Sequence, residues 1–81
     1  MKVEIYGRPG CAFCDLAKEL CERTGVAYDY KIVGESVSRE QLEEMVGSPV
    51  RSVPQIFVTT NGFSEYVGGF NELKGRLTHH G

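Results

Sequence analysis

Two thiols stand three positions apart near the start of the chain, at Cys11 and Cys14 in the stretch GRPGCAFCDL. Cysteines at this C-x-x-C spacing can bind a metal, form a structural disulfide or carry out thiol–disulfide exchange. Arg8 places a positive charge close to the first of them. The residues around the pair indicate which of these three kinds of chemistry applies.

The cysteine pair is predicted to lie where a strand gives way to a helix. Residues 2–6 alternate in polarity, which predicts a strand, and 7–10 form a loop. Residues 12–24 carry side chains at helical spacing, namely Phe13, Leu16, Ala17, Leu20 and Thr24, and Gly25 follows as a C-cap. Cys11 is then expected at the helix N-terminus, where free N–H groups and the helix dipole favour a thiolate. Cys14 would lie one turn later, within reach of a disulfide, and this arrangement favours redox chemistry.

A zinc site would need two further ligands, and the sequence offers few. Cys21 is the only other cysteine, and His79 and His80 stand at the far end of the chain, in a segment that we interpret as a solvated tail. Cys21 follows Cys14 by seven positions on the same helical face. We interpret it as a small buried hydrophobe, with a second redox role as the alternative.

Composition limits the remaining classes of protein. The 81 residues suffice for one domain, which we place at 1–81, and 41% hydrophobic residues fit a compact globule. A net charge of −2 argues against nucleic-acid binding, and no apolar run approaches the roughly 20 residues that span a bilayer. No signal-peptide pattern follows Met1, so we expect a cytoplasmic protein. In that reducing compartment a close cysteine pair is more often catalytic or metal-binding than a static cross-link.

The middle of the chain predicts a second strand and a second helix. Residues 26–33 are rich in Tyr, Ile and Val, which favours a strand. Ser38 and Gln41 have the spacing of a capping box at a helix start, and Gly47 ends that helix. Its apolar stripe is predicted to comprise Leu42, Met45 and Val46.

The last third predicts a hairpin and a final helix. Strands at 55–59 and 63–67 are joined by Asn61-Gly62, a strong signal for a type I′ turn. The final helix is predicted to start near Asn71 and to bury Phe70, Leu73 and Leu77. The order of elements is therefore βαβ followed by αββα. It predicts an α/β fold with a four-stranded mixed sheet flanked by helices, in which the first two strands are parallel.

Three stretches, GRPGCAFC, RSVPQIFV and VGGFNEL, together resemble the glutaredoxins of the small dithiol branch over nearly the whole chain. The resemblance implies a thioredoxin-like fold in which a cis proline, here Pro54, faces the active cysteine. It also implies a glutathione-dependent thiol–disulfide oxidoreductase that reduces protein–glutathione mixed disulfides and small or protein disulfides. Glutathione would be its co-substrate, without a permanently bound cofactor or metal. A monomer is expected, and ribonucleotide reductase is a client by family analogy.

The resemblance also implies roles for individual residues. Cys11 matches the nucleophile and Cys14 the resolving thiol. The positions that match glutathione contacts are Tyr6, Arg8, Phe13, Arg51, Ser52, Val53, Pro54, Gly69, Asn71 and Glu72. Among them, Ser52 and Val53 match the segment that pairs with the glutathione backbone. Arg51 matches a position used for the glycyl carboxylate.

The γ-glutamyl end is expected at Asn71 and Glu72, at a helix N-terminus suited to an anion. Three of the site residues have alternative interpretations. Phe13 could pack in the core, Arg51 could be a surface charge, and Asn71 is a helix cap in either case.

The sequence departs from the family pattern at the cysteine pair. C-A-F-C replaces the usual C-P-Y-C, so Phe13 lacks a hydroxyl, and Ser52 stands where Thr is usual. Two other functions are kept as alternatives. One is a hydrogen donor recharged by thioredoxin reductase, against which Asn71 and Glu72 speak. The other is a dimer that carries an iron–sulfur cluster on two Cys11 thiolates and two glutathiones.

Overall fold

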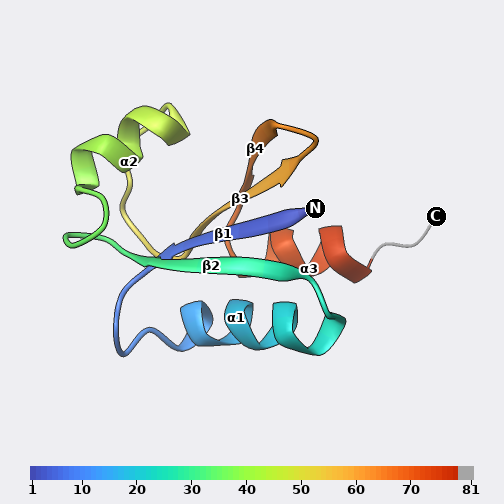
Figure 1. Ribbon diagram of the computed structural model, residues 1–81. Coiled ribbons are helices and arrows are strands. Elements are labelled where there is room, and N and C mark those ends of the chain that lie inside the picture. Colours follow the sequence, from blue (N-terminus) through green and yellow to red (C-terminus); the bar gives the residue numbers. More distant parts are fainter. Residues whose placement is uncertain (79–81) are drawn as a thin grey trace.

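The computed structural model describes residues 1–78, so the predicted tail at His79 and His80 lies outside the described residues. Its elements follow the predicted order (Figure 1). They are β1 (Lys2–Gly7), α1 (Ala12–Thr24), β2 (Ala27–Ile32), α2 (Arg39–Val46), β3 (Gln55–Thr60), β4 (Phe63–Gly68) and α3 (Phe70–Thr78). The observed ends of the helices and strands differ from the predicted ones by one residue or less. Assigned element ends commonly vary by that amount.

The four strands form one mixed sheet in the order β2-β1-β3-β4. β1 and β2 are parallel and connected through α1, whereas β1–β3 and β3–β4 are antiparallel. Helices α1 and α3 cover one face of the sheet and α2 covers the other (Figure 1). The predicted α/β architecture is confirmed.

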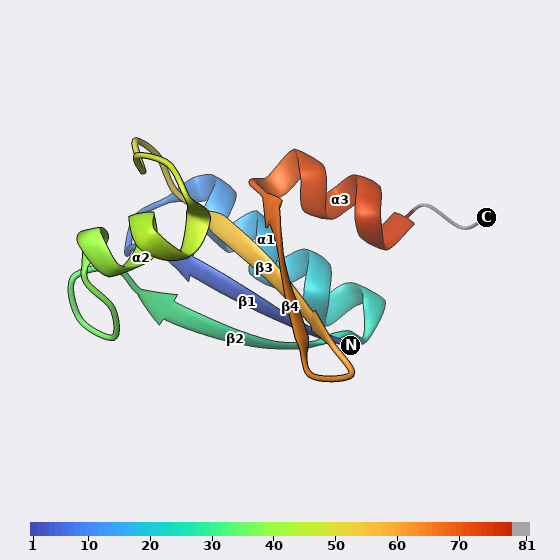
Figure 2. The same cartoon turned by 90° about the horizontal axis from the view of Figure 1, so that it is seen from above.

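Strand alternation divides the core between the two faces. The larger cluster, on the side of α1 and α3, contains Val3, Ile5, Ala17, Leu20, Cys21, Ile56, Val58, Leu73 and Leu77. The smaller one, under α2, contains Tyr6, Leu42, Val50 and Phe57. Helix α2 covers only one end of its face (Figure 2). Charged side chains lie elsewhere on the sheet, where Lys31 pairs with Glu4 at 3.3 Å.

The buried face of α1 matches the predicted one only in part, at Ala17 and Leu20. Cys14, Ala17, Leu20 and Cys21 are buried, whereas Phe13 and Leu16 are 56% and 40% exposed. The helix packs on the sheet through Ala17, Leu20 and Cys21, and the buried Cys14 lies beside Gly7 of β1. A count of large apolar residues gives too little weight to the two cysteines. This confirms Cys21 as a small buried hydrophobe and shows that Phe13 is not a core residue.

The capping predictions hold in detail. Ser38 and Gln41 form the reciprocal capping box of α2, and Gly25 and Gly47 adopt left-handed C-cap conformations. Asn61 and Gly62 both have positive φ (52° and 83°), as a type I′ turn requires.

Two predicted core residues are less buried than expected. Met45 is exposed rather than buried, because the short α2 contacts the core mainly through Leu42. Phe70 is only half-buried.

Among residues 1–78, the structure contains no helix long and apolar enough to cross a membrane.

Candidate active site

The cysteine pair forms a disulfide at the start of α1. Cys11 is the N-cap residue, and the backbone N–H of Cys14 donates to its sulfur at 3.2 Å. Cys14 is fully buried, whereas Cys11 is partly exposed. An incoming thiol or disulfide can therefore reach Cys11 and not Cys14.

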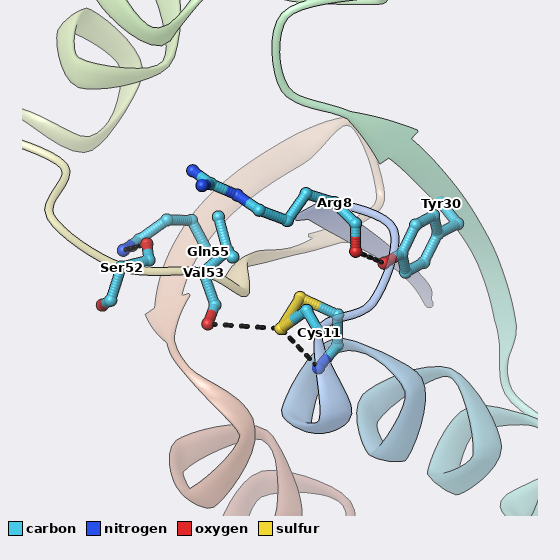
Figure 3. Close-up of a disulfide and its surroundings, with 7 residues drawn as sticks. Arg8, Cys11, Tyr30, Ser52, Val53 and Gln55 are labelled. Carbon is cyan, nitrogen blue, oxygen red and sulfur yellow. Dashed lines mark hydrogen bonds between the residues drawn. A yellow bond between two sulfur atoms is a disulfide. The ribbon is translucent and has the colours of Figure 1, made fainter.

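The loop before β3 faces the disulfide. The Val53–Pro54 peptide bond is cis, and the Val53 carbonyl oxygen lies 3.7 Å from the Cys11 sulfur (Figure 3). This is the arrangement that the resemblance implied for Pro54. It places the Val53 backbone directly beside the reactive sulfur.

A buried glutamine holds this loop, and the sequence analysis did not identify it. The Gln55 side chain donates to the Ser52 carbonyl at 2.8 Å and accepts from the Tyr66 hydroxyl at 2.5 Å. Gln55 is only 8% exposed. The sequence does contain a signal for this role, because a glutamine directly before the apolar run of Ile56, Phe57 and Val58 needs buried hydrogen-bond partners.

A first cavity, of about 290 Å³, opens between the Val53 loop and the N-terminus of α3. It is lined by Phe13, Ser52, Val53, Pro54, Gly69, Phe70, Asn71 and Glu72. The Phe13 ring leans on Phe70 with 6.0 Å between ring centroids. The structure thus brings together seven of the predicted site residues and adds Phe70.

Glu72 occupies the start of α3. Its carboxylate accepts from the backbone N–H of Gly69 at 2.8 Å. Gly68 has φ of +128°, and a Cβ there would lie only 2.9 Å from the Glu72 side chain. A glycine at this position therefore lets the carboxylate fold back over the helix end, where it adds a negative charge to a cavity with free helix amides.

A second cavity, of about 260 Å³, is cationic. It is lined by Arg8, Val33, Arg39, Val50 and Arg51. The Arg8 side chain extends across the site toward the segment of Ser52 and Val53 (Figure 3). The sequence analysis identified Arg8 and Arg51 but not Arg39, which donates to the Val50 carbonyl at 3.1 Å and pairs with Glu43.

The remaining predicted site residue, Tyr6, lines neither of these two cavities. It is 4% exposed and packs edge-on against Phe57 at 5.8 Å between ring centroids. Lys31 places its ammonium 5.4 Å from the Tyr6 ring centroid. In this structure Tyr6 supports the sheet at the end of β1, from which the active-site loop departs.

A C-x-x-C disulfide at a helix N-terminus, facing a cis proline on a four-stranded mixed sheet, defines a redox protein of thioredoxin-like fold. Comparison with known families narrows this class. The glutaredoxin family model matches residues 3–63, and the chain belongs to the glutaredoxin family. Glutaredoxins are thiol–disulfide oxidoreductases, so the chain is an enzyme of that class.

Individual relatives agree with this assignment. The chain is 37% identical to glutaredoxin 1 of Escherichia coli K12 over 79 residues, which cover 90% of this chain and 88% of that protein. The solution structure of oxidised E. coli glutaredoxin matches with a TM-score of 0.77 at 31% identity, covering 99% and 96% of the two chains. A buckwheat glutaredoxin–glutathione complex shares the fold, with a TM-score of 0.70 at 19% identity over 91% of this chain and 66% of that one.

Proposed function

We propose that this protein is a glutathione-dependent oxidoreductase that reduces protein–glutathione mixed disulfides, as well as small and protein disulfides. One observation carries the proposal. The accessible Cys11 sulfur lies beside the Val53 loop, and two cavities of different charge adjoin that region. Glutathione has complementary ends, a zwitterionic γ-glutamyl group and a glycyl carboxylate.

The α3 cavity suits the γ-glutamyl end. The free amides at the start of α3, near Asn71, can bind its carboxylate, and the Glu72 carboxylate can bind its ammonium group. The Val53 backbone is positioned to pair with the central peptide. The glycyl carboxylate would then point toward Arg8 and Arg51, whose positive charges suit it.

The chemistry starts at Cys11 in the reduced enzyme. Its thiolate attacks the glutathione sulfur of a mixed disulfide, the Cys11–glutathione bond forms, and the protein thiolate leaves and takes up a proton. A second glutathione thiolate then attacks the glutathione sulfur on Cys11. This step releases oxidised glutathione and regenerates the Cys11 thiolate. For a protein disulfide, Cys14 resolves the intermediate and closes the disulfide seen in the structure.

Several finer features belong to the same proposal. Glutathione acts as a co-substrate, and no cofactor is permanently bound. The enzyme works as a monomer in the cytoplasm, where the glutathione pool is kept reduced and supplies the electrons. Ribonucleotide reductase is a client by family analogy alone.

A coupled assay tests the proposal. Reduction of a glutathionylated peptide should proceed with glutathione and glutathione reductase, and should fall at least tenfold when thioredoxin reductase replaces them. Cys11→Ser should abolish turnover with either reductant. Efficient recharging by thioredoxin reductase alone, or substantial activity of Cys11→Ser, would overturn the proposal.

A further inference from the structure

The missing side chain of Gly7 brings a phenol close to the buried cysteine. Gly7 ends β1 on the face that packs against α1. A Cβ placed there would lie 2.7 Å from the Tyr30 hydroxyl oxygen and 2.8 Å from the Cys14 sulfur. The hydroxyl and the sulfur are therefore separated by no more than the sum of these two distances.

Within residues 1–78, the Tyr30 hydroxyl of the disulfide form makes a single, long hydrogen bond. It donates to the Arg8 carbonyl at 3.3 Å (Figure 3). A backbone carbonyl at this distance is a weak acceptor, and a disulfide sulfur is weaker still. The hydroxyl is thus free to turn to a stronger acceptor nearby.

The surroundings of Tyr30 keep it a donor. Burial and the negative charge of Asp15 raise the pKa of Tyr30 above its ordinary value of 10.0, so the hydroxyl keeps its proton at neutral pH. Lys18 also lies near the ring, with its ammonium 5.5 Å from the ring centroid.

Cys14 needs such a donor when the disulfide opens. Its side chain is 0% exposed, so water cannot solvate a thiolate formed there. A buried charge without a hydrogen bond is costly, and that cost adds to the barrier for its formation.

We propose that the Tyr30 hydroxyl turns from the Arg8 carbonyl to the Cys14 sulfur and stabilises the Cys14 thiolate during disulfide exchange. The inference rests on the proposed exchange at Cys11. In the opening step an incoming glutathione thiolate attacks the Cys11 sulfur, and the new sulfur–sulfur bond forms there. The Cys11–Cys14 bond breaks, and its electron pair leaves on Cys14, where the Tyr30 O–H donates to it.

The role is confined to steps that involve Cys14. Monothiol exchange between Cys11 and glutathione never places a charge on Cys14. Tyr30 should therefore matter for opening the enzyme disulfide and not for deglutathionylation by a protein that lacks Cys14.

The strand offers a matched control. Tyr28 lies two residues earlier on the same face of β2, and its hydroxyl donates to Glu22 at 2.6 Å. Tyr28→Phe and Tyr30→Phe each remove one phenolic oxygen and keep the ring. Phe at position 30 retains the packing against the core, so the variant is expected to fold as the control does.

The experiment follows the opening of the oxidised protein by excess glutathione, with acid quenching and mass analysis of the disulfide and glutathionylated forms. Tyr30→Phe should slow opening about tenfold, the size expected when a hydrogen bond to a charged group is lost. Tyr28→Phe should match the unmodified protein. In a Cys14→Ser background, adding Tyr30→Phe should leave deglutathionylation unchanged.

Unchanged opening in Tyr30→Phe would overturn the inference, as would an equal loss of rate in the Cys14→Ser background, which would indicate a general effect on the site. These results differ from failure of the proposed function, in which the unmodified protein itself would not react with glutathione.

Discussion

The Cys11 sulfur lies 3.7 Å from the carbonyl oxygen of Val53, although 42 positions separate the two residues. The sheet explains this proximity. β1 and β3 are antiparallel neighbours that pair Tyr6 with Gln55, so the end of one strand and the start of the other lie at the same edge. The loops that follow Tyr6 and precede Gln55 therefore meet, and the site is built from two segments that the central strand pair holds together.

Cys14→Ser should separate the two reactions of the enzyme. Glutathione can replace Cys14 in the resolution of a glutathione mixed disulfide, so deglutathionylation should remain within a few-fold of the unmodified rate. Direct reduction of a protein disulfide should fall by more than tenfold, because Cys14 is no longer present to resolve the mixed disulfide between Cys11 and the client protein. Parallel assays with a glutathionylated peptide and a disulfide-bonded protein measure this split. Equal losses on both substrates would contradict the assigned role of Cys14.

Arg51→Glu should weaken recognition of glutathione and leave the chemistry intact. Arg51 is exposed and lines the cationic cavity, so the reversed charge should raise KM for a glutathionylated peptide several-fold and change kcat little. The effect should shrink at high salt, which screens exposed charges.

Arg23→Glu is the matched control for Arg51→Glu. It makes the same charge change at an exposed position in the last turn of α1. Its KM should stay close to that of the unmodified protein. If both variants raise KM equally, net charge rather than a site at Arg51 governs binding.

The order of elements could be predicted from the sequence because the local signals are strong. Ser38 and Gln41 specify a capping box, and Asn61-Gly62 specifies a type I′ turn. The buried face of α1 could not be predicted by the same means. Phe13 outranks Cys14 on any scale of apolar area, yet Cys14 packs into the sheet and Phe13 turns to the α3 cavity.

The site was predicted through its motif residues, and its supporting contacts were missed. Gln55 and Tyr66 meet only because β3 and β4 pair in a particular register, which no local pattern specifies. Arg39 joins Arg8 and Arg51 only after α2 has packed over the end of the sheet. Such contacts depend on tertiary structure, so sequence spacing alone does not contain them.

Gly7→Ala should destabilise the fold and disturb the cysteine pair. The added Cβ would collide with the Tyr30 hydroxyl and the Cys14 sulfur, and overpacking of this kind costs about 1–3 kcal/mol. Gly75→Ala is the matched control, because nothing lies within 4 Å of its added Cβ on α3. It should stabilise the helix by roughly 0.5–1 kcal/mol. Urea unfolding of both oxidised variants measures the change in the free energy of unfolding. If Gly7→Ala leaves this free energy unchanged, the space above Gly7 is not filled.

The stability of the oxidised protein should fall between about pH 9 and pH 11 because of Cys21. Burial, with the nearby charge of Glu22, raises the pKa of its thiol from 9.0 to about 11. The folded protein therefore holds this proton more tightly than the unfolded chain. The resulting stabilisation is fully present below pH 9 and is lost as pH rises toward 11.

Cys21→Ala isolates the contribution of the Cys21 thiol. The other two cysteines do not titrate in the disulfide form, and Cys21 is not among the causes of the raised pKa of Tyr30. The pKa of Tyr28 is raised mainly by its hydrogen bond to Glu22, which both proteins keep. At neutral pH the variant should be less stable, because it loses a buried sulfur from the larger core cluster. The difference in the free energy of unfolding should narrow as pH rises from 9 to 11, measured by urea unfolding at several pH values. If the two pH profiles run parallel, Cys21 ionises no less readily in the folded state than in the unfolded chain, and the assigned effect of its burial is wrong.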